Sequence, residues 1–248
     1  MQAAMRKPVL HFLRMRAPIQ EQLRVEEALF RVDKARNWFI YNERSTPATI
    51  VMGISGKPDK LLHLDAVKRD GIPVLKRFSG GGTVIVDHNT IFTTFICNSN
   101  AFPAVKPYPR EIMAWSIEFF KPFFAREFAL REDDYVFADR KFGGNAQSIS
   151  KDRWLHHTSF LWDFDPRNME YLTNPARQPK YRDQRSHTEF LCTLKEVLNE
   201  KEPTSQEQFV KELHEELADK FDVRDVELAE VAPMLEQEHR KSTRFLEL

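Results

Sequence analysis

Cysteine and glycine are scarce in this chain of 248 residues, which contains two cysteines and eight glycines. Two thiols, Cys97 and Cys192, are too few for a disulfide scaffold or a cysteine-based metal cluster, and they suit a reducing compartment. No apolar run approaches the roughly 20 residues that a membrane span requires. Lys plus Arg and Asp plus Glu are equal at 37 each, so no overall field attracts nucleic acid or a membrane surface. We therefore expect a soluble, intracellular protein whose attraction for anions is local.

The stretch before Glu21 carries Arg6, Lys7, Arg14 and Arg16 and no acidic residue. This bias is compatible with an organellar presequence, but serine is absent there. The alternative is a first strand over residues 9–15 with a basic outer face. A cytoplasmic or an organellar location, in a mitochondrion or plastid, stays open.

Three of the eight glycines stand together at Gly80, Gly81 and Gly82, between Lys76-Arg77 and the strand-like run that starts at Thr83. Glycine permits positive φ and lets a ligand approach exposed main-chain N–H groups. Because basic residues lead into this turn, a phosphate is the expected guest, and a glycine-rich hairpin loop is the alternative. The spacings GxxxxGK[ST] and GxGxxG are both missing, which excludes a P-loop or Rossmann turn.

A second glycine segment, residues 139–147, places Lys141 just before Gly143 and Gly144, and His156 and His157 follow in a strand-like run. A lysine ammonium beside accessible amides could hold phosphate and acyl oxygens. The alternative is a surface lysine in a turn.

Short strands mixed with a few amphipathic helices indicate an α+β protein. We expect helices over 19–35, over 113–128 with a kink at Pro122, and from Thr204 through a capping box with Glu207. We expect the runs 74–76, 83–86 and 91–97 to be antiparallel neighbours around the triple-glycine turn, and residues 174–186 to form a mobile surface loop. Further strands are expected at 38–41, 49–52 and 158–164.

Together the two glycine segments resemble the lipoate–protein ligase A family, the biotin/lipoate protein ligase catalytic domain. In that family an Arg-Ser-Gly-Gly-Gly turn precedes a strand and an aspartate, and a Lys-x-x-Gly-x-Ala turn precedes a histidine-containing strand. Residues 23–30, 133–135 and 171–172, with Arg185, also match the family. The resemblance implies mixed and antiparallel sheets with flanking helices, as in biotin ligases and class II aminoacyl-tRNA synthetases. It implies a single catalytic domain over residues 1–248, without the C-terminal accessory domain of larger ligases.

The resemblance implies an ATP-dependent acyl-protein ligase or acyltransferase that forms or uses lipoyl-AMP. The acyl group would pass to a lysine of a lipoyl carrier domain, such as a 2-oxoacid dehydrogenase E2 subunit or the glycine cleavage H protein. The protein would bind ATP, Mg²⁺ and lipoate. Whether the full reaction needs a separate accessory protein stays open. Neither nucleic acid nor a membrane span is implied.

By the same resemblance Lys141 is the expected catalytic residue, and Asp134 is the candidate Mg²⁺ ligand. Residues expected to contact the substrate or nucleotide are Arg77, Ser79, Gly80, Gly81, Gly82, Thr83, Val84, Ile85, Asn89, Asp134, Gly143, Gly144, Asn145, Ala146, His157 and Ser159. His157 would border the lipoyl pocket, and His156 would point to the opposite face of its strand. Asn89 or Thr90 would supply a polar contact that the family takes from another residue.

Two alternatives remain open at this point. A cysteine-dependent octanoyltransferase on the same fold would need Cys97 or Cys192 as its nucleophile, and neither lies in a glycine segment. A non-catalytic protein could bind lipoate or its adenylate without turnover. A biotin ligase is disfavoured, because its glycine- and arginine-rich loop is absent.

Overall fold

Two mixed β-sheets form the framework of the computed structural model, which describes residues 7–124, 128–174, 178–199 and 202–248. The larger sheet has eight strands, in which β1 is parallel to both of its neighbours and the other pairs are antiparallel. Its order is β11 (Asp222–Val226), β1 (Val9–Met15), β2 (Trp38–Asn42), β6 (Thr90–Asn98), β10 (Arg153–Leu161), β9 (Arg140–Ile149), β8 (Asp134–Phe137) and β7 (Ala129–Arg131).

The smaller sheet has four strands, with β3 parallel to β4 and antiparallel to β5. Its order is β12 (Arg244–Phe245), β4 (Val74–Lys76), β3 (Thr49–Met52) and β5 (Thr83–Val86). The triple-glycine turn joins β4 to β5, so it emerges from this sheet.

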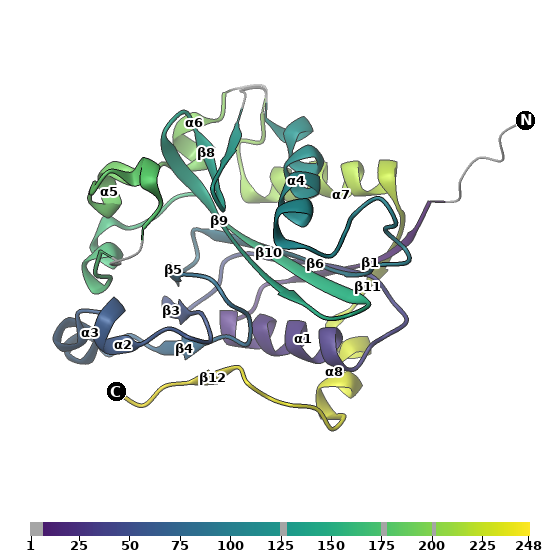
Figure 1. Ribbon diagram of the computed structural model, residues 1–248, viewed down its shortest axis with the longest axis horizontal. Helices are drawn as coiled ribbons and strands as arrows, with labels where there is room; N and C mark the ends of the chain where they lie inside the picture. Colours follow the sequence, from purple (N-terminus) through teal and green to yellow (C-terminus); the bar gives the residue numbers. More distant parts are fainter. Residues whose placement is uncertain (1–6, 125–127, 175–177, 200–201) are drawn as a thin grey trace, which may run out of the picture.

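Helices cover both faces of the larger sheet (Figure 1). One face carries α1 (Ile19–Arg31) and α8 (Leu228–Glu236), and the other carries α4 (Pro109–Phe120) and α7 (Gln206–Lys220). The shorter helices are α2 (Pro58–Leu61), α3 (Leu64–Asp70), α5 (His187–Phe190), α6 (Leu194–Val197) and the 3₁₀ turns η1 (Lys121–Phe123), η2 (Pro166–Tyr171) and η3 (Lys180–Arg182). Among the helices of the described residues, none combines the length and apolar character that crossing a membrane would require.

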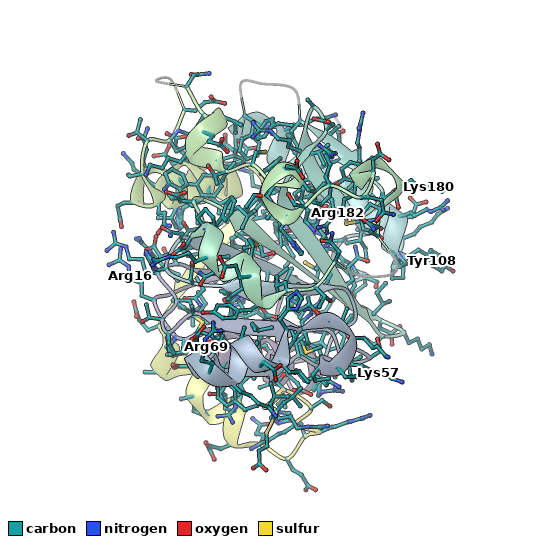
Figure 2. All side chains as sticks on the ribbon, turned by 90° about the vertical axis from the view of Figure 1, so that its left-hand side faces the viewer. Arg16, Lys57, Arg69, Tyr108, Lys180 and Arg182 are labelled. Atoms are coloured by element: carbon teal, nitrogen blue, oxygen red, sulfur yellow. The ribbon has the colours of Figure 1, made fainter. Side chains whose placement is uncertain are left out.

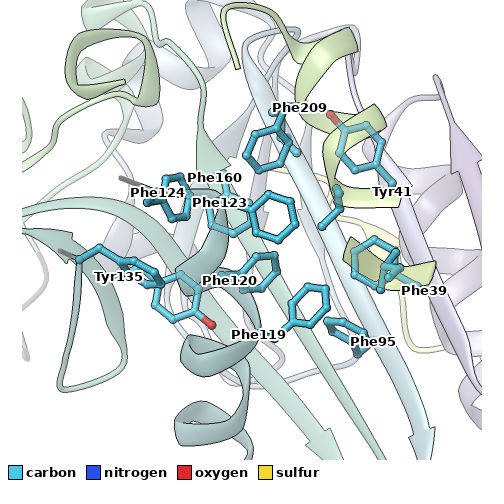
Figure 3. Packing of buried hydrophobic residues seen from close by; sticks show 14 of the residues in the cluster. Phe39, Tyr41, Phe95, Phe119, Phe120, Phe123, Phe124, Tyr135, Phe160 and Phe209 are labelled. Carbon is cyan, nitrogen blue, oxygen red and sulfur yellow. The ribbon is translucent and has the colours of Figure 1, made fainter. Parts of the chain in front are cut away.

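The largest apolar cluster lies between the larger sheet and the helices α4 and α7 (Figure 3). Aromatic rings dominate it: the ring centroids of Phe120 and Phe160 are 5.1 Å apart, and those of Phe39 and Phe95 are 4.5 Å apart. Edge-to-face contacts of this kind stabilise a core beyond the area that they bury. The opposite face differs, because α1 buries Gln22 and Glu26 as well as its apolar stripe.

The predicted α+β class, with mixed sheets and flanking helices, is confirmed. The strands at 49–52, 74–76 and 83–86 begin and end as predicted, and the basic stretch after residue 8 forms β1. The predicted antiparallel pairing of the runs 74–76, 83–86 and 91–97 is wrong: β3 lies between β4 and β5, and β6 belongs to the larger sheet. Alternation of side chains identifies a strand, but pairing depends on contacts between distant segments.

Three further expectations require correction. Lys141 lies in strand β9, because residues 140–149 complete a long hairpin with β10, and not in a turn. The described residues of the segment 174–186 lie mostly at the surface, as expected, but η3 (Lys180–Arg182) gives the segment some regular structure, and Arg182 is buried. The helix α7 is capped by Ser205, whose hydroxyl accepts from the N–H of Gln208, so the cap falls one residue after Thr204.

The C-terminal segment runs back beneath α1 to the smaller sheet (Figure 1). Its main-chain N–H groups at Ser242 and Thr243 donate to the buried carboxylate of Glu27, over 2.9 to 3.0 Å. The strand β12 then pairs with β4, where Arg244 lies opposite Lys76. This contact supports the strand that leads into the triple-glycine turn.

Candidate active site

Arg77 organises the triple-glycine turn from inside. Its side chain is buried and donates to the carbonyl oxygens of Gly80 (Nη2, 2.6 Å) and Gly82 (Nη2, 2.9 Å) and to Ser79 Oγ (Nε, 3.1 Å). Burial lowers the pKa of Arg77 to about 10, so the guanidinium stays charged at neutral pH. Arg77 was expected to line the substrate pocket. In the structure its guanidinium instead stabilises the turn through these hydrogen bonds.

The amide groups of the turn are left available. Among the described residues, no hydrogen bond engages the N–H of Gly80, Gly81 or Gly82. The carbonyl oxygens of Gly80 and Gly82 accept from Arg77 instead. Gly81 has a positive φ of 96°, which side chains rarely adopt. Adjacent main-chain amides without partners can form a concave site for an anion.

The triple-glycine turn touches strand β9. A Cβ atom placed on Gly81 would lie 2.9 Å from Cβ of Ala146, closer than side chains normally approach. On the other side, a Cβ on Gly53 would lie 2.2 Å from the carbonyl oxygen of Gly81. The two glycine segments of the sequence therefore converge, although they belong to different sheets.

Lys141 lies in the same strand, five residues before Ala146. Its ammonium group binds Oδ1 of Asp134 at 2.7 Å, and a Cβ on Gly144 would lie 3.2 Å from Lys141 Nζ. Gly144 thus leaves the space through which the lysine side chain crosses the strand. The side chain of Lys141 remains 22% exposed, which keeps the ammonium within reach of a ligand.

Tyr181 completes the surroundings of the lysine and was missed by the sequence analysis. Its hydroxyl donates to Oδ2 of Asp134 at 2.9 Å, so that carboxylate is engaged on both oxygens. Burial and the neighbouring Asp134 raise the pKa of Tyr181 well above its usual range, which keeps the hydroxyl a donor. Arg185 donates to the Tyr181 carbonyl at 2.9 Å and to Asp139, and thereby ties this segment to the start of β9.

A buried polar group lies behind the turn, where Glu26 of α1 meets His157 of β10. Glu26 Oε2 is 3.1 Å from His157 Nδ1, and Glu26 Oε1 accepts from Thr94 (2.6 Å) and Gln22 (2.9 Å). Burial lowers the pKa of His157, although the charge of Glu26 opposes the shift. A neutral ring with its proton on Nδ1 donates to the Glu26 carboxyl group. Glu26 was missed because it lies on a helix, 131 residues before its histidine partner.

His156 and His157 point to opposite faces of β10. His156 contacts Gln147 (3.2 Å) and Thr158 (3.4 Å) on the α4 side, where burial lowers its pKa to about 3. Asn145 also lies on that side, because its side chain accepts from Thr158 Oγ1 at 2.6 Å and donates to the carbonyl of Asp133.

Gly143 likewise faces the aromatic core, since a Cβ there would approach Tyr135 within 3.1 Å. Gly143 and Asn145 therefore face the opposite side of the sheet from Gly144, Ala146, His157 and Ser159. The ligand contacts expected of all six residues stay predictions.

The remaining candidates lie along β5 and the ends of neighbouring strands. Ile85 and Val84 pack in the apolar clusters on either face of the smaller sheet, and the buried hydroxyl of Thr83 has no partner among the described residues. Ser159 Oγ donates to the Gly144 carbonyl at 3.4 Å. Thr90 binds the amide of Asp87 through its hydroxyl, whereas for Asn89 only main-chain contacts occur with described residues.

Metal ligands are few in this region. Among the described residues, no group of three or more His, Cys, Asp or Glu side chains could hold a metal ion. A single carboxylate, Asp134, fits Mg²⁺ only if a nucleotide supplies most of the oxygens, which is the usual arrangement for this ion.

Both cysteines are poor nucleophiles. Burial raises the pKa of Cys97 well above its usual range and that of Cys192 to about 11. A thiol held protonated at neutral pH reacts slowly, because the thiolate is the nucleophile.

Comparison with known proteins places this geometry in a family. The family model described as the lipoyl protein ligase A/B catalytic domain matches residues 18–218. The chain is 28% identical over 239 residues to the inactive lipoate–protein ligase 2 of Plasmodium falciparum, covering 73% of this chain and 62% of that protein. It therefore spans about three fifths of the length of this curated relative.

Solved structures show the same fold at lower identity. A bi-partite lipoate protein ligase from Thermoplasma acidophilum, described with its E2 lipoyl domain, aligns with a TM-score of 0.72 at 17% identity, over 93% of this chain and 90% of the other. A lipoate-protein ligase A bound with ATP aligns with a TM-score of 0.71 at 17% identity, over 93% and 92%. On the family match, the chain belongs to the lipoyl protein ligase A/B catalytic domain family.

Proposed function

We propose that this chain is a lipoate–protein ligase or lipoyltransferase, which forms or uses lipoyl-AMP and transfers the acyl group to a lysine of a lipoyl carrier domain. The observation that carries the proposal is the contact of the triple-glycine turn with the strand that bears Lys141, at Gly81 and Ala146. This contact brings amides without partners and one ammonium group to the same region, which suits an acyl–phosphate junction.

In the activation step, a carboxylate oxygen of lipoate attacks the α-phosphorus of ATP, and pyrophosphate leaves with the electron pair of the broken P–O bond. Negative charge builds on the α-phosphate oxygens. We assign their stabilisation to Lys141 and to the amides of Gly80, Gly81 and Gly82, because donors fixed in advance lower the barrier most. Asp134 would hold Mg²⁺ together with the phosphates of the nucleotide.

In the transfer step, the amine of the carrier lysine attacks the acyl carbon of lipoyl-AMP and loses a proton, and the bond to the AMP oxygen breaks. Lys141 would stabilise the oxyanion of the tetrahedral intermediate and the leaving AMP. Asp134 positions the ammonium group of Lys141 through its Oδ1, at 2.7 Å. Tyr181 holds the Asp134 carboxylate in turn, by donating to Oδ2 at 2.9 Å. Carriers such as E2 subunits or the glycine cleavage H protein belong to this proposal, as does a single catalytic domain.

A non-catalytic binding role is the second candidate, because one relative is named an inactive lipoate–protein ligase. It would keep the pocket and bind lipoate or its adenylate without turnover. The cysteine-dependent octanoyltransferase is disfavoured, because burial raises the pKa of both thiols.

The test uses purified protein, an apo lipoyl domain and two donors in separate arms: ATP with lipoate, and lipoyl-AMP. The first arm is run with and without an accessory ligase protein, since the T. acidophilum relative is bi-partite. We expect a mass increase of one lipoyl group on the carrier. The substitution Lys141→Ala should lower the transfer rate by about 10²- to 10³-fold, the usual loss for one donor to a developing oxyanion.

Lys211→Ala is the matched control, because Lys211 is an exposed lysine of α7. Tight binding of lipoyl-AMP by calorimetry without any adduct would establish the binding role instead. No adduct and no binding would remove both candidates.

A further inference from the structure

Glu27 of α1 is buried, with 2% of its surface exposed, and the proposed chemistry gives it no role. Its carboxylate accepts from two consecutive main-chain N–H groups: Ser242 donates to Oε1 at 2.9 Å and to Oε2 at 3.0 Å, and Thr243 donates to Oε2 at 2.9 Å. Successive main-chain amides form a nest for an anion. Because a buried carboxylate is costly unless it is bonded, Glu27 and this part of the chain stabilise one another.

The strap, defined as residues 242–246, runs from α1 to the smaller sheet. Its strand β12 is antiparallel to β4, and the N–H of Leu246 donates to the Val74 carbonyl at 2.8 Å. Arg77 follows the last residue of β4 directly and begins the triple-glycine turn. The strap therefore fixes one edge of the strand that leads into the turn.

A second path from Glu27 to the turn passes through Arg31, one helical turn later. Arg31 Nε donates to Glu27 Oε1 at 3.0 Å, and the guanidinium carbon lies 5.6 Å from the centroid of the Phe78 ring. Phe78 is buried and stands between Arg77 and Ser79, whose side chains are bonded to each other at 3.1 Å. Glu27 is thus connected to the turn by two routes, the strap and Arg31.

The side chains of the strap take no part in this attachment. Ser242 Oγ and Thr243 Oγ1 are buried, and neither has a hydrogen-bond partner among the described residues. The bonds to Glu27 come from main-chain N–H groups, which a change of side chain at these positions retains. The hydroxyls therefore offer a matched control for the carboxylate.

The strap lies away from the reacting groups. Figure 2 shows the C-terminal segment, in yellow, at the bottom of the molecule, whereas Arg182, next to Tyr181, is labelled in its upper half. Within the described residues, Glu27 has no hydrogen bond or ion pair with Lys141 or Asp134. The strap also lies outside residues 18–218, which the family model matches. Glu27 can therefore act on the reaction only through the turn.

We propose that Glu27 is a positioning residue, which holds the triple-glycine turn in its ligand-binding shape through the strap and Arg31. This inference rests on the proposed function, in which amides of the turn contact lipoyl-AMP. Without the carboxylate, the turn adopts that shape only part of the time, and the apparent affinity falls by the same fraction. The groups around Lys141 are unchanged, so the rate at saturating lipoyl-AMP is retained.

The first experiment measures lipoyl-AMP binding by calorimetry and transfer kinetics with the full chain. Glu27→Ala should weaken binding and raise KM for lipoyl-AMP about tenfold at unchanged kcat, which corresponds to a turn that is competent about a tenth of the time. Glu27→Gln keeps the length of the side chain and one acceptor oxygen, and it should lose about threefold. Ser242→Ala removes an unpaired hydroxyl, retains the N–H, and should behave as the wild type.

A covalent tether separates positioning from a merely stabilising role. Arg244 lies opposite Lys76 in the antiparallel pair of β12 and β4, at a spacing that a disulfide can bridge. Arg244→Cys with Lys76→Cys is made in the Glu27→Ala background. Glutathione disulfide oxidises the two thiols, is itself reduced to glutathione, and is then removed. The tether should restore most of the lost affinity, whereas Arg244→Ser with Lys76→Ser should restore none.

Three results would overturn the assignment: equal affinity in Glu27→Ala and the wild type, a lower kcat at unchanged KM, or a tether that restores nothing. Hydrogen exchange tests the positioning without a ligand. The N–H of Ile54 donates to the Ser79 carbonyl at 3.0 Å, and it should exchange faster in Glu27→Ala, whereas that of Ile112 in α4 should not. If the wild type neither binds lipoyl-AMP nor transfers from it, the proposed function fails, and this exchange still decides whether Glu27 positions the turn.

Discussion

The two faces of the larger sheet differ most clearly at the adjacent histidines of β10. On the α4 side, His156 borders a cluster of aromatic rings, of which Phe120, Phe160 and Tyr135 are fully buried. On the α1 side, His157 meets the buried carboxyl group of Glu26 beside the triple-glycine turn. Burying polar groups is costly unless they are bonded, and it adds little to stability even when they are. The comparison indicates that the first face stabilises the fold, and in the proposed function the second face serves the ligand.

The largest expected effect lies on the aromatic face. Phe120→Ala should lower the free energy of unfolding by about 3–5 kcal/mol, because the ring packs against Phe119, Phe123, Tyr135 and Phe160 and leaves a cavity when removed. Lys141→Ala should change it by about 1 kcal/mol or less, as befits a partly exposed ion pair. Urea unfolding of both variants makes the comparison, and equal losses would show that the two faces are not distinct.

An intermediate effect is expected at the triple-glycine turn. Gly81→Ala places a Cβ at positive φ, 2.9 Å from Ala146 and 2.6 Å from Arg77 Nη2, so the turn must shift. Strain of about 1–3 kcal/mol corresponds to a loss of roughly 5- to 150-fold in affinity for lipoyl-AMP, measured by calorimetry.

Gly71→Ala is the matched control for that change, because Gly71 also has positive φ (63°) but has open space around it. It should affect stability and leave the affinity for lipoyl-AMP intact. A similar loss of affinity in both variants would mean that the turn is not in contact with the ligand.

The smallest effect is a pH dependence of stability. The pKa values of His156 (about 3) and His187 (about 4) lie below the usual 6.5, so between pH 6.5 and about 4 the unfolded chain binds more protons than the folded chain. Stability should therefore fall as pH decreases through this window, by up to about 1.4 kcal/mol per pH unit for each histidine. Removing His156 by His156→Gln should flatten the slope of the urea-derived free energy against pH. A slope that stays the same would contradict its buried, neutral state.

Local sequence patterns predicted the strands better than they predicted which strands pair with one another. The strands β3, β4 and β5 followed from short apolar runs bounded by Gly and Pro, yet the position of β3 between β4 and β5 depends on contacts that no single run contains. The same limit explains Lys141: two glycines suggested a turn, but pairing with β10 extends the strand through them.

The candidate site was predictable where the residues formed a motif. Lys141 and the triple-glycine turn came from resemblance, and the structure brings their segments together at Gly81 and Ala146. Glu26 was missed, although an acidic residue between Val25 and Leu29 on a buried stripe was a signal that could have identified it. Tyr181 lay in a polar, basic segment, and its hydroxyl is bonded to Asp134, which lies far away in the sequence.

The most direct test of the account is a crystal structure of the protein with a non-hydrolysable lipoyl-adenylate analogue. We expect its acyl–phosphate junction within about 3 Å of Lys141 Nζ and of at least one amide of Gly80–Gly82. An analogue bound elsewhere, with Lys141 contacting only Asp134, would contradict the claim that the two glycine segments form one site.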